Sequence, residues 1–229
     1  MNASVFVTGT DTGVGKTWVS SALIEALARS GLTVTGMKPV ATGATHQGQL
    51  LVHEDVRALI AASNVALPRR YVNPYLYLPP CSPNIAAERA RVPIELPTVL
   101  EAYQACAERA DAVVVEGAGG WCVPLADNLL IEDLARALAL PVLLVVGVRL
   151  GCISHAILSA RAIIESGLPL LGWVANIVDP ATLEMQAVIQ TLSRHLDAPR
   201  LATLEWAPGA TPASVAPRLQ AVVEALRRR

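Results

Sequence analysis

Aromatic and charged residues are scarce in this sequence. Aromatic side chains make up 4% of the 229 residues and charged side chains 16%, whereas hydrophobic residues make up 53%. The core must therefore be built from Ala, Val, Leu and Ile, and so apolar a chain folds into a packed globule instead of remaining disordered. A formal net charge of −1 leaves no positive excess, which argues against a general nucleic-acid or anionic-membrane surface.

Cysteine, histidine and long apolar runs are also few. The four histidines are scattered and the four cysteines include no CxxC pair, so a His/Cys metal site is not expected. No segment approaches the ~20 apolar residues that a transmembrane helix needs, and the apolar start is too short for a signal peptide. We expect a cytoplasmic protein with reduced thiols, and with neither a membrane nor a nucleic acid as partner.

Short apolar runs alternate with amphipathic segments, which is typical of βαβ units in an α/β domain. The predicted strands are residues 4–7, 33–37, 112–116, 142–146, 170–174 and 200–203. The predicted helices are residues 16–29, 52–62, 83–89, 99–110, 131–138, 153–166, 183–195 and 213–226. The prolines and tyrosines of residues 71–83 favour an extended loop. We predict one domain over residues 1–229, a doubly wound, mostly parallel sheet with helices on both faces as in P-loop NTPases, with sites at the carboxyl ends of the strands.

Residues 9–17 read GTDTGVGKT and follow the apolar run of the first predicted strand. Glycines let the backbone turn tightly enough for successive N–H groups to point at phosphate oxygens. Lys16 would supply positive charge for the terminal phosphates, Thr17 would bind Mg²⁺, and the helix beginning there adds its N-terminal dipole. Gly9 lies six residues before Gly15, a wider spacing than in the common P-loop. A glycine-rich turn with a solvated lysine would leave GKT at a helix start unexplained, so we predict nucleotide phosphate binding.

Three charged residues fall at predicted strand or helix ends. Lys38 follows the second strand, where it would add a second cation opposite the phosphate loop, although taken alone it is better explained as a solvated lysine. Glu116 ends an apolar strand and precedes GAGG, as expected of Mg²⁺ coordination beside a closely approaching phosphate. Asp55 opens a helix, where an isolated carboxylate is more often a helix-start charge than a ligand.

Two further segments follow predicted strands. Residues 151–155, GCISH, begin a helix whose N–H groups form either an anion site or an ordinary cap. Asn176 offers a paired donor and acceptor that would read a base edge, or else it lies in a turn. The tryptophans are better explained as packing and cleft walls than as a platform for nucleic acid; they are Trp18, Trp121, Trp173 and Trp206.

Six segments between about residues 5 and 178 carry a family resemblance: FVTGTDTGVGKT, GMKPVATG, VNPY, VVVEGAGGW, LLVVGVRLGCISHA and GWVANIV. Together, and in the spacing of the first glycines, they resemble dethiobiotin synthetase. The resemblance implies an ATP- and Mg²⁺-dependent ligase that closes the cyclic urea of dethiobiotin from 7,8-diaminononanoate and CO₂, through a carbamate and a mixed carbamic–phosphoric anhydride. It also implies a homodimer, in which the helix start at residues 151–154 receives the substrate carboxylate from the partner's site.

The resemblance further implies roles for individual residues. Lys38, Lys16 and Thr12 would be catalytic, and Thr17, Asp55 and Glu116 would surround Mg²⁺. The substrate contacts would be Thr12, Lys38, Thr42, Gly151, Cys152, Ile153 and Ser154. ATP would be bound by Gly13, Val14, Gly15, Lys16, Thr17, Trp18, Asp55, Glu116, Gly117, Ala118, Gly119, Asn176, Ile177, Glu205, Trp206 and Ala207.

Three residues depart from the family pattern: Gly13 replaces a glutamate of some relatives, Thr42 a serine and Ser154 an asparagine. The alternative function is an ATP-driven switch of the partitioning-ATPase type. Such proteins normally carry a signature lysine inside the phosphate loop, and residues 10–14 contain none. A third possibility, amide ligation on a larger metabolite, would need a glutamine-hydrolysing domain or partner.

Overall fold

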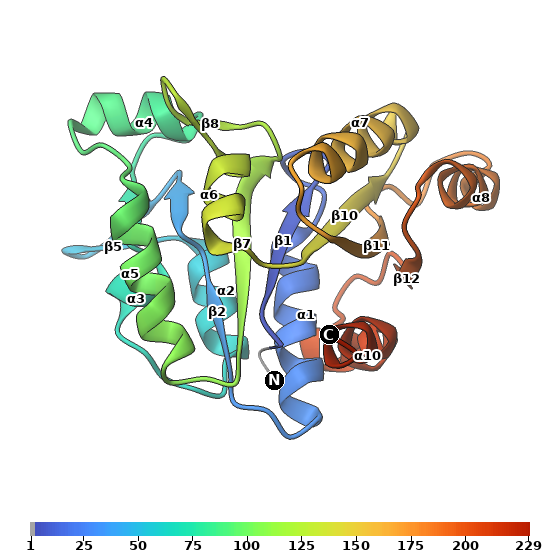
Figure 1. Cartoon of the computed structure of the whole chain (residues 1–229), viewed down its shortest axis with the longest axis horizontal. Coiled ribbons are helices and arrows are strands. Elements are labelled where there is room, and N and C mark those ends of the chain that lie inside the picture. Colours follow the sequence, from blue (N-terminus) through green and yellow to red (C-terminus); the bar gives the residue numbers. More distant parts are fainter. Residues whose placement is uncertain (1–2) are drawn as a thin grey trace.

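The computed structural model describes residues 3–229 and is built on a six-stranded parallel sheet (Figure 1). The strands are β1 (Val5–Gly9), β2 (Val34–Met37), β7 (Ala112–Gly120), β10 (Val142–Val148), β11 (Leu170–Ile177) and β12 (Arg200–Leu204). Their order across the sheet is β12-β11-β10-β1-β7-β2. The chain builds β2 and β7 on one side of β1 and then β10 to β12 on the other. This reversal beside β1 is a switch point of the kind where α/β sheets bind ligands, and it confirms the predicted fold class.

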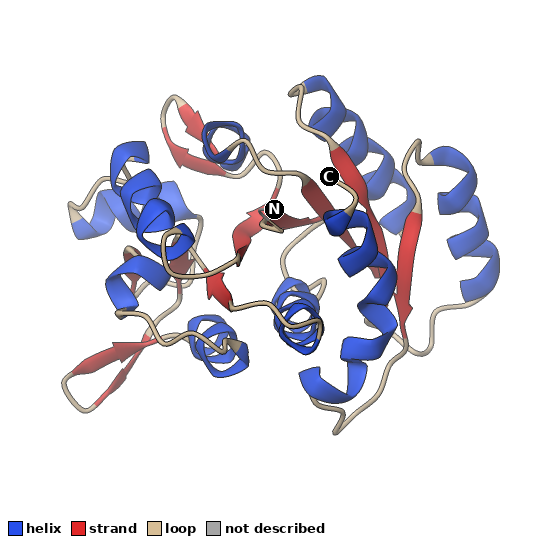
Figure 2. Cartoon of the chain, turned by 60° about the horizontal axis from the view of Figure 1, so that its bottom comes forward, coloured by secondary structure: helices blue, strands red, loops and turns tan. Residues whose placement is uncertain are grey.

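Alternate residues of each strand face opposite sides of the sheet. Phe6 packs in one apolar cluster, whereas Val5 and Val7 pack in the other. Because side chains alternate along a strand, a sheet covered on both faces needs apolar residues at every position. The first face is covered by α5 (Leu96–Ala107), α6 (Ile131–Leu138), α7 (Cys152–Glu165) and α8 (Met185–His195), and the second by α1 (Lys16–Arg29), α2 (Glu54–Ala62) and α10 (Gln220–Arg227). Figure 2 shows the strands between these helices.

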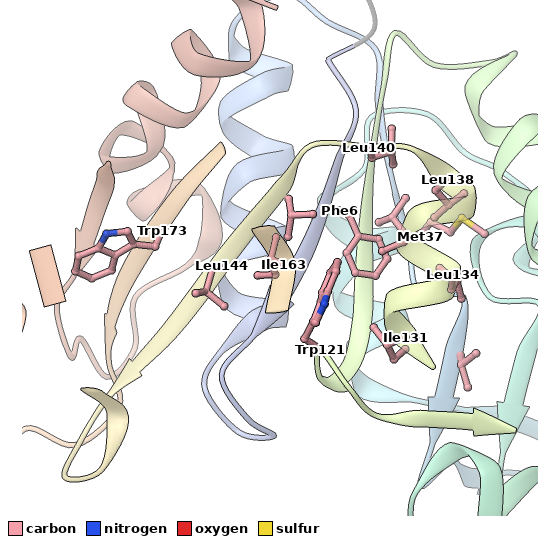
Figure 3. Close-up of a cluster of buried hydrophobic side chains, with 14 of the residues drawn as sticks. Phe6, Met37, Trp121, Ile131, Leu134, Leu138, Leu140, Leu144, Ile163 and Trp173 are labelled. Atoms are coloured by element: carbon pink, nitrogen blue, oxygen red, sulfur yellow. The ribbon is translucent and has the colours of Figure 1, made fainter. Parts of the chain in front are cut away.

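The larger cluster is organised around aromatic side chains. Phe6 packs edge-to-face against Trp121, with ring centroids 6.1 Å apart and planes at 82°, and Trp173 lies further along the same cluster (Figure 3). Such ring pairs add about 0.5–1.5 kcal/mol beyond the burial of their area. Trp121 is 2% exposed and Trp173 0%, which confirms that these two tryptophans are packing residues.

Short elements surround the carboxyl edge of the sheet in the described chain. β3 (Val40–Thr42) pairs in parallel with β6 (Tyr75–Tyr77), and two hairpins are formed by β4 (Thr45–Gln47) with β5 (Leu50–Val52) and by β8 (Pro124–Ala126) with β9 (Leu129–Leu130). Two further helices are α3 (Arg69–Val72) and α4 (Pro83–Ala90). The loop predicted over residues 71–83 was therefore wrong in part, because Tyr75–Tyr77 forms backbone hydrogen bonds with β3.

Three other predictions were wrong in their bounds. The helix predicted at residues 213–226 is divided into α9 (Pro212–Val215), the 3₁₀ helix η1 (Ala216–Leu219) and α10, because Pro217 has no N–H to continue the helical bonding. β7 and β11 are longer than predicted, so Glu116 lies inside its strand instead of at its end, and Asn176 lies within a strand instead of after it. None of the helices described in residues 3–229 is long and apolar enough to cross a membrane.

Candidate active site

The glycine-rich loop joins β1 to α1 at the carboxyl edge of the sheet. Gly15 caps α1 with a left-handed backbone (φ 86°), and a Cβ atom there would lie 2.2 Å from Nδ2 of Asn176. Val14 is 1% exposed and fits against Gly9 and Gly147, where added Cβ atoms would come within 2.6 Å and 2.9 Å of its side chain. The loop is thus anchored by a buried side chain, and the first-turn N–H groups of α1 have no partner within the helix.

Asn176 supports this loop from the neighbouring strand β11. Its side-chain amide donates to the carbonyl oxygen of Val14 at 2.9 Å. A cavity of about 390 Å³ adjoins it and brings together many of the residues predicted to bind ATP, namely Gly13, Gly15, Trp18, Asn176, Ile177, Glu205, Trp206 and Ala207. Trp206 is 53% exposed and Trp18 is half-buried, so these two tryptophans are walls of a cavity at the surface.

Lys38 lies between two carboxylates. Its Nζ is 2.5 Å from Oε1 of Glu116 and 3.0 Å from Oδ2 of Asp55. Lys38 is 4% exposed and Glu116 0%, so water screens this attraction far less than it would at the surface. Burial alone would lower the pKa of Lys38, but Glu116 and Asp55 raise it above its ordinary value. Burial alone would raise the pKa of Asp55, but Lys38 holds it below its ordinary value; the lysine is therefore a buried cation and not a solvated one.

Thr17 and Lys16 connect the loop to this centre. The Thr17 hydroxyl donates to Oε1 of Glu116 at 2.8 Å, whereas Oε2 of Glu116 is buried without a hydrogen-bond partner among the described residues. The ammonium of Lys16 donates to the carbonyl oxygen of Asp11 at 2.8 Å. Burial, reinforced by the nearby charge of Lys38, lowers the pKa of Lys16 to about 8. Lys16 is thus a cation at neutral pH that gives up its proton more readily than an ordinary lysine.

These groups line a cavity of about 770 Å³ at the edge of the sheet. Of the predicted site residues, it is lined by Thr12, Gly13, Gly15, Lys16, Thr17, Lys38, Thr42, Asp55, Glu116, Ala118 and Gly119. Gly117 instead accepts a hydrogen bond from Lys38 through its carbonyl oxygen at 3.4 Å. The lining also includes His53, Pro80, Cys81, Ser82 and Val123, which the sequence analysis missed. Of these residues, Ser82 carried a signal, as a preferred N-cap residue directly before the helix predicted at residues 83–89.

The helix start predicted to bind a carboxylate lies at a second cavity of about 600 Å³, whose walls include Arg149, Leu150, Gly151, Ile153 and Ser154. Gly151 caps α7 with a left-handed backbone (φ 91°). Cys152 does not fit the predicted substrate contact, because its side chain is 3% exposed and packs in the core, and its N–H donates to the carbonyl oxygen of Arg149. Arg149 also pairs with Asp11 of the phosphate loop at 2.6 Å, a link between the two cavities that the sequence analysis did not find.

The donor set at the main cavity fits Mg²⁺. Thr17, Asp55 and Glu116 offer oxygen atoms, which are the ligands that Mg²⁺ prefers. The unpartnered Oε2 of Glu116 is a buried acceptor that a cation would satisfy. Within residues 3–229 no three His, Cys, Asp or Glu side chains are grouped to hold a metal by themselves. Mg²⁺ usually keeps several waters and takes substrate phosphates as further ligands, so one or two carboxylates from the protein are enough to bind it.

Comparisons with known proteins agree with the geometry of the loop and the sheet. The family model of an AAA domain matches residues 3–214. The septum site-determining protein MinD complexed with Mg-ADP from Pyrococcus horikoshii OT3 superposes with a TM-score of 0.60 at 16% identity, covering 100% of this chain and 96% of that one. A ParA family ATPase from Chlorobium tepidum TLS gives 0.58 at 13% identity, covering 99% and 100%. At such low identity these structures show the fold alone.

Sequence similarity is much higher to one group of enzymes. The ATP-dependent dethiobiotin synthetase BioD of Nitrosospira multiformis is 48% identical over 206 residues, covering 90% of this chain and 89% of that protein. A protein of the same name from Pseudomonas aeruginosa is 48% identical over 215 residues, covering 93% of this chain and 94% of that protein. The chain therefore belongs to the dethiobiotin synthetase family.

Proposed function

We propose that this protein, as a single domain, is an ATP-dependent dethiobiotin synthetase of biotin biosynthesis. It joins 7,8-diaminononanoate and CO₂ into the cyclic urea of dethiobiotin and converts ATP to ADP and phosphate. The observation that carries the proposal is the buried ammonium of Lys38, held by Glu116 and Asp55 beside the phosphate loop, in a chain that is 48% identical to named synthetases. A partitioning-type ATPase shares only the fold, and its signature lysine is missing from residues 10–14.

The reaction would follow three bond-forming steps. An amine of the substrate takes up CO₂ and loses a proton, which gives a carbamate. A carbamate oxygen attacks the γ-phosphorus and ADP leaves, so that a mixed carbamic–phosphoric anhydride forms. The second amine attacks the anhydride carbonyl, loses a proton and expels phosphate, which closes the ring. Negative charge develops on oxygen in each step, and fixed cations stabilise it most where water is excluded.

The residues of the main cavity match these needs. Lys38 would face the carbamate and the transferred phosphoryl group, because it lines the cavity. Lys16 would hold the carbamate and the terminal phosphates from the loop, and Thr12 and Thr42, which line the same cavity, would contact the amine end of the substrate. Mg²⁺, held by Thr17, Asp55 and Glu116, would neutralise phosphate charge when bound. The adjoining cavity at Asn176 and Trp206 would take the adenine.

We further propose that the enzyme is a homodimer with a shared site. Leu150 is 99% exposed and Leu158 of α7 61%, and such side chains beside a polar site are typical of an interface. The carboxylate lies at the opposite end of the extended nine-carbon substrate from its amines, so it would bind away from the phosphate loop, at Gly151 and Ser154 in the first turn of α7 of the partner. Helix N–H groups can bind that anion without an asparagine side chain.

A product assay tests the function. The purified protein is supplied with ATP, Mg²⁺, bicarbonate and diaminononanoate, and the products are identified by mass. We expect dethiobiotin and ADP in equal amounts, with little ADP when the diamine is left out. ADP release that is independent of the diamine, without dethiobiotin, would contradict the proposal and favour an ATPase switch.

A cytoplasmic location stays a prediction, to be checked by cell fractionation.

A further inference from the structure

His53 lies where two walls of the main cavity meet. It follows β5 directly and is the N-cap of α2, and its side chain is 15% exposed. Its Nδ1 accepts the backbone N–H of Asp55 at 3.2 Å, while its Nε2 lies 3.0 Å from the carbonyl oxygen of Thr42. Because Nδ1 accepts, the ring proton is on Nε2 and is donated to Thr42. Each ring nitrogen thus binds a different segment of the site.

Along the chain these two segments are joined through an exposed hairpin, and in space Ala41 of β3 and Val56 of α2 belong to one small apolar cluster. After Thr42 the chain runs out through β4 and returns through β5, with Thr45 opposite Val52. All residues of β4 are exposed, and Leu50 of β5 is 71% exposed. Few buried contacts hold such a hairpin, so by itself it fixes the distance between its ends poorly. The His53 ring closes the base of the hairpin.

We propose that His53 is a positioning residue that holds Thr42 and Asp55 in register across the cavity. The inference rests on the proposed function, in which Thr42 contacts the diamine and Asp55 belongs to the Mg²⁺ site. Nδ1 fixes the first turn of α2, from which the Asp55 carboxylate reaches Lys38 at 3.0 Å. Nε2 fixes the end of β3, where Thr42 lines the same cavity. The His53 ring therefore positions one residue for the diamine and another for Mg²⁺, and its two hydrogen bonds can be removed separately.

Two substitutions separate the contacts. In His53→Asn the side-chain oxygen stands near the position of Nδ1 and can still cap Asp55, but nothing reaches Thr42. In His53→Gln the amide nitrogen stands near the position of Nε2 and can still donate to Thr42, but the cap is lost. His46→Ala is the matched control, because His46 is an exposed histidine of the same hairpin. Each variant is compared with the parent by two measurements, the KM for diaminononanoate and the Mg²⁺ concentration that gives half of the ATP-induced rise in Tm.

The proposal predicts opposite profiles for the two variants. His53→Asn should raise the KM for the diamine about five- to tenfold, the net worth of one hydrogen bond, and leave the Mg²⁺ midpoint within about twofold. His53→Gln should raise the Mg²⁺ midpoint about five- to tenfold and leave the KM within about twofold. His46→Ala should change neither.

Parallel changes in both constants for both variants, or no change in either, would overturn the proposal. Loss of cooperative unfolding in both variants would overturn it too, because His53 would then have only a structural role. Failure of the proposed function looks different. The parent and His46→Ala would then make no dethiobiotin, while the Tm measurement would still report whether His53 acts on the Mg²⁺ site.

Discussion

Lys16 should make ATP binding sensitive to alkaline pH. The residue is 6% exposed, and burial together with the charge of Lys38 lowers its pKa from 10.5 to about 8. At pH 7 about nine in ten of the free protein molecules therefore carry the Lys16 charge, whereas at pH 9 only about one in ten does. An ordinary lysine would remain almost fully charged over this range.

The size of the effect follows from the difference between the free and the bound protein. Bound phosphates favour the charged form of Lys16 and raise its pKa, so the complex keeps the proton that the free protein has lost. The affinity for ATP should be constant below about pH 7 and should fall about tenfold per pH unit above about pH 8.5. Phosphate itself ends its ionisation near pH 6, so the ligand does not change over this interval. Lys16→Arg, whose guanidinium stays protonated over this whole range, should lose no affinity with rising pH.

The assay is equilibrium binding of a fluorescent ATP analogue between pH 6.5 and 9.5 or so, without the diamine, whose own amines titrate. Unfolding is excluded by measuring Tm at each pH. Because the folded pKa of Lys16 lies below the unfolded value, the unfolded chain binds more protons between about 8 and 10.5, and this lysine destabilises the fold less as the pH rises. A flat affinity for the parent, or an equal decline for Lys16→Arg, would refute the reasoning.

Three other predictions concern the same site. Lys38→Ala should lower kcat at least ~100-fold, and it should also lower the free energy of unfolding by about 3–5 kcal/mol because Glu116 loses its buried partner. Adding Glu116→Gln to Lys38→Ala should restore the stability but not kcat. Normal turnover of folded Lys38→Ala would disprove the catalytic role. Glu116→Gln alone should raise the Mg²⁺ concentration needed for half-maximal activity, and a Mg²⁺ dependence equal to that of the parent would remove Glu116 from the metal site. Lys38→Ala and Ser154→Trp should each be inactive alone, but mixing them should restore activity in about one quarter of the sites after subunit exchange. Half of the dimers are then mixed, and one of the two sites in each mixed dimer is intact. No recovery despite proven exchange would contradict the shared site.

The strands of the central sheet could be predicted because they are buried on both faces. Runs such as those of β7 and β10 are apolar at consecutive positions, and little else in a chain of this length has that pattern. The β4–β5 hairpin was missed for the opposite reason. Its strands have only three residues each, and the polar Thr45–Gln47 and the apolar Leu50–Val52 show no alternation of apolar and polar residues, so the pattern did not set them apart from a loop.

The site could be predicted only in part, because a sequence gives residue types but not the partners of buried groups. The loop residues Lys16 and Thr17 were assigned from local spacing. Taken alone, Lys38 was better explained as a solvated lysine, since its partners Asp55 and Glu116 lie 17 and 78 residues away along the chain. The parallel pairing of β2 with β7 brings Lys38 beside Glu116, and the first turn of α2 adds Asp55. His53 was missed in the same way, because its meaning depends on the carbonyl oxygen of Thr42 across the hairpin.

The charges of the site also bear on the form in which ATP enters it. Lys16 and Lys38 are two buried cations, and Asp55 and Glu116 lie against Lys38 as two anions, so the set has no net charge. A neutral set can remain buried, whereas an unpaired charge among these groups would cost several kcal/mol or so. A triphosphate would add negative charge to this neutral set, and Lys38 could neutralise it only by breaking its ion pairs with Asp55 and Glu116. A divalent cation that arrives with the nucleotide removes the conflict, because it satisfies Glu116 and the phosphates together. ATP should therefore bind this site as its Mg²⁺ complex.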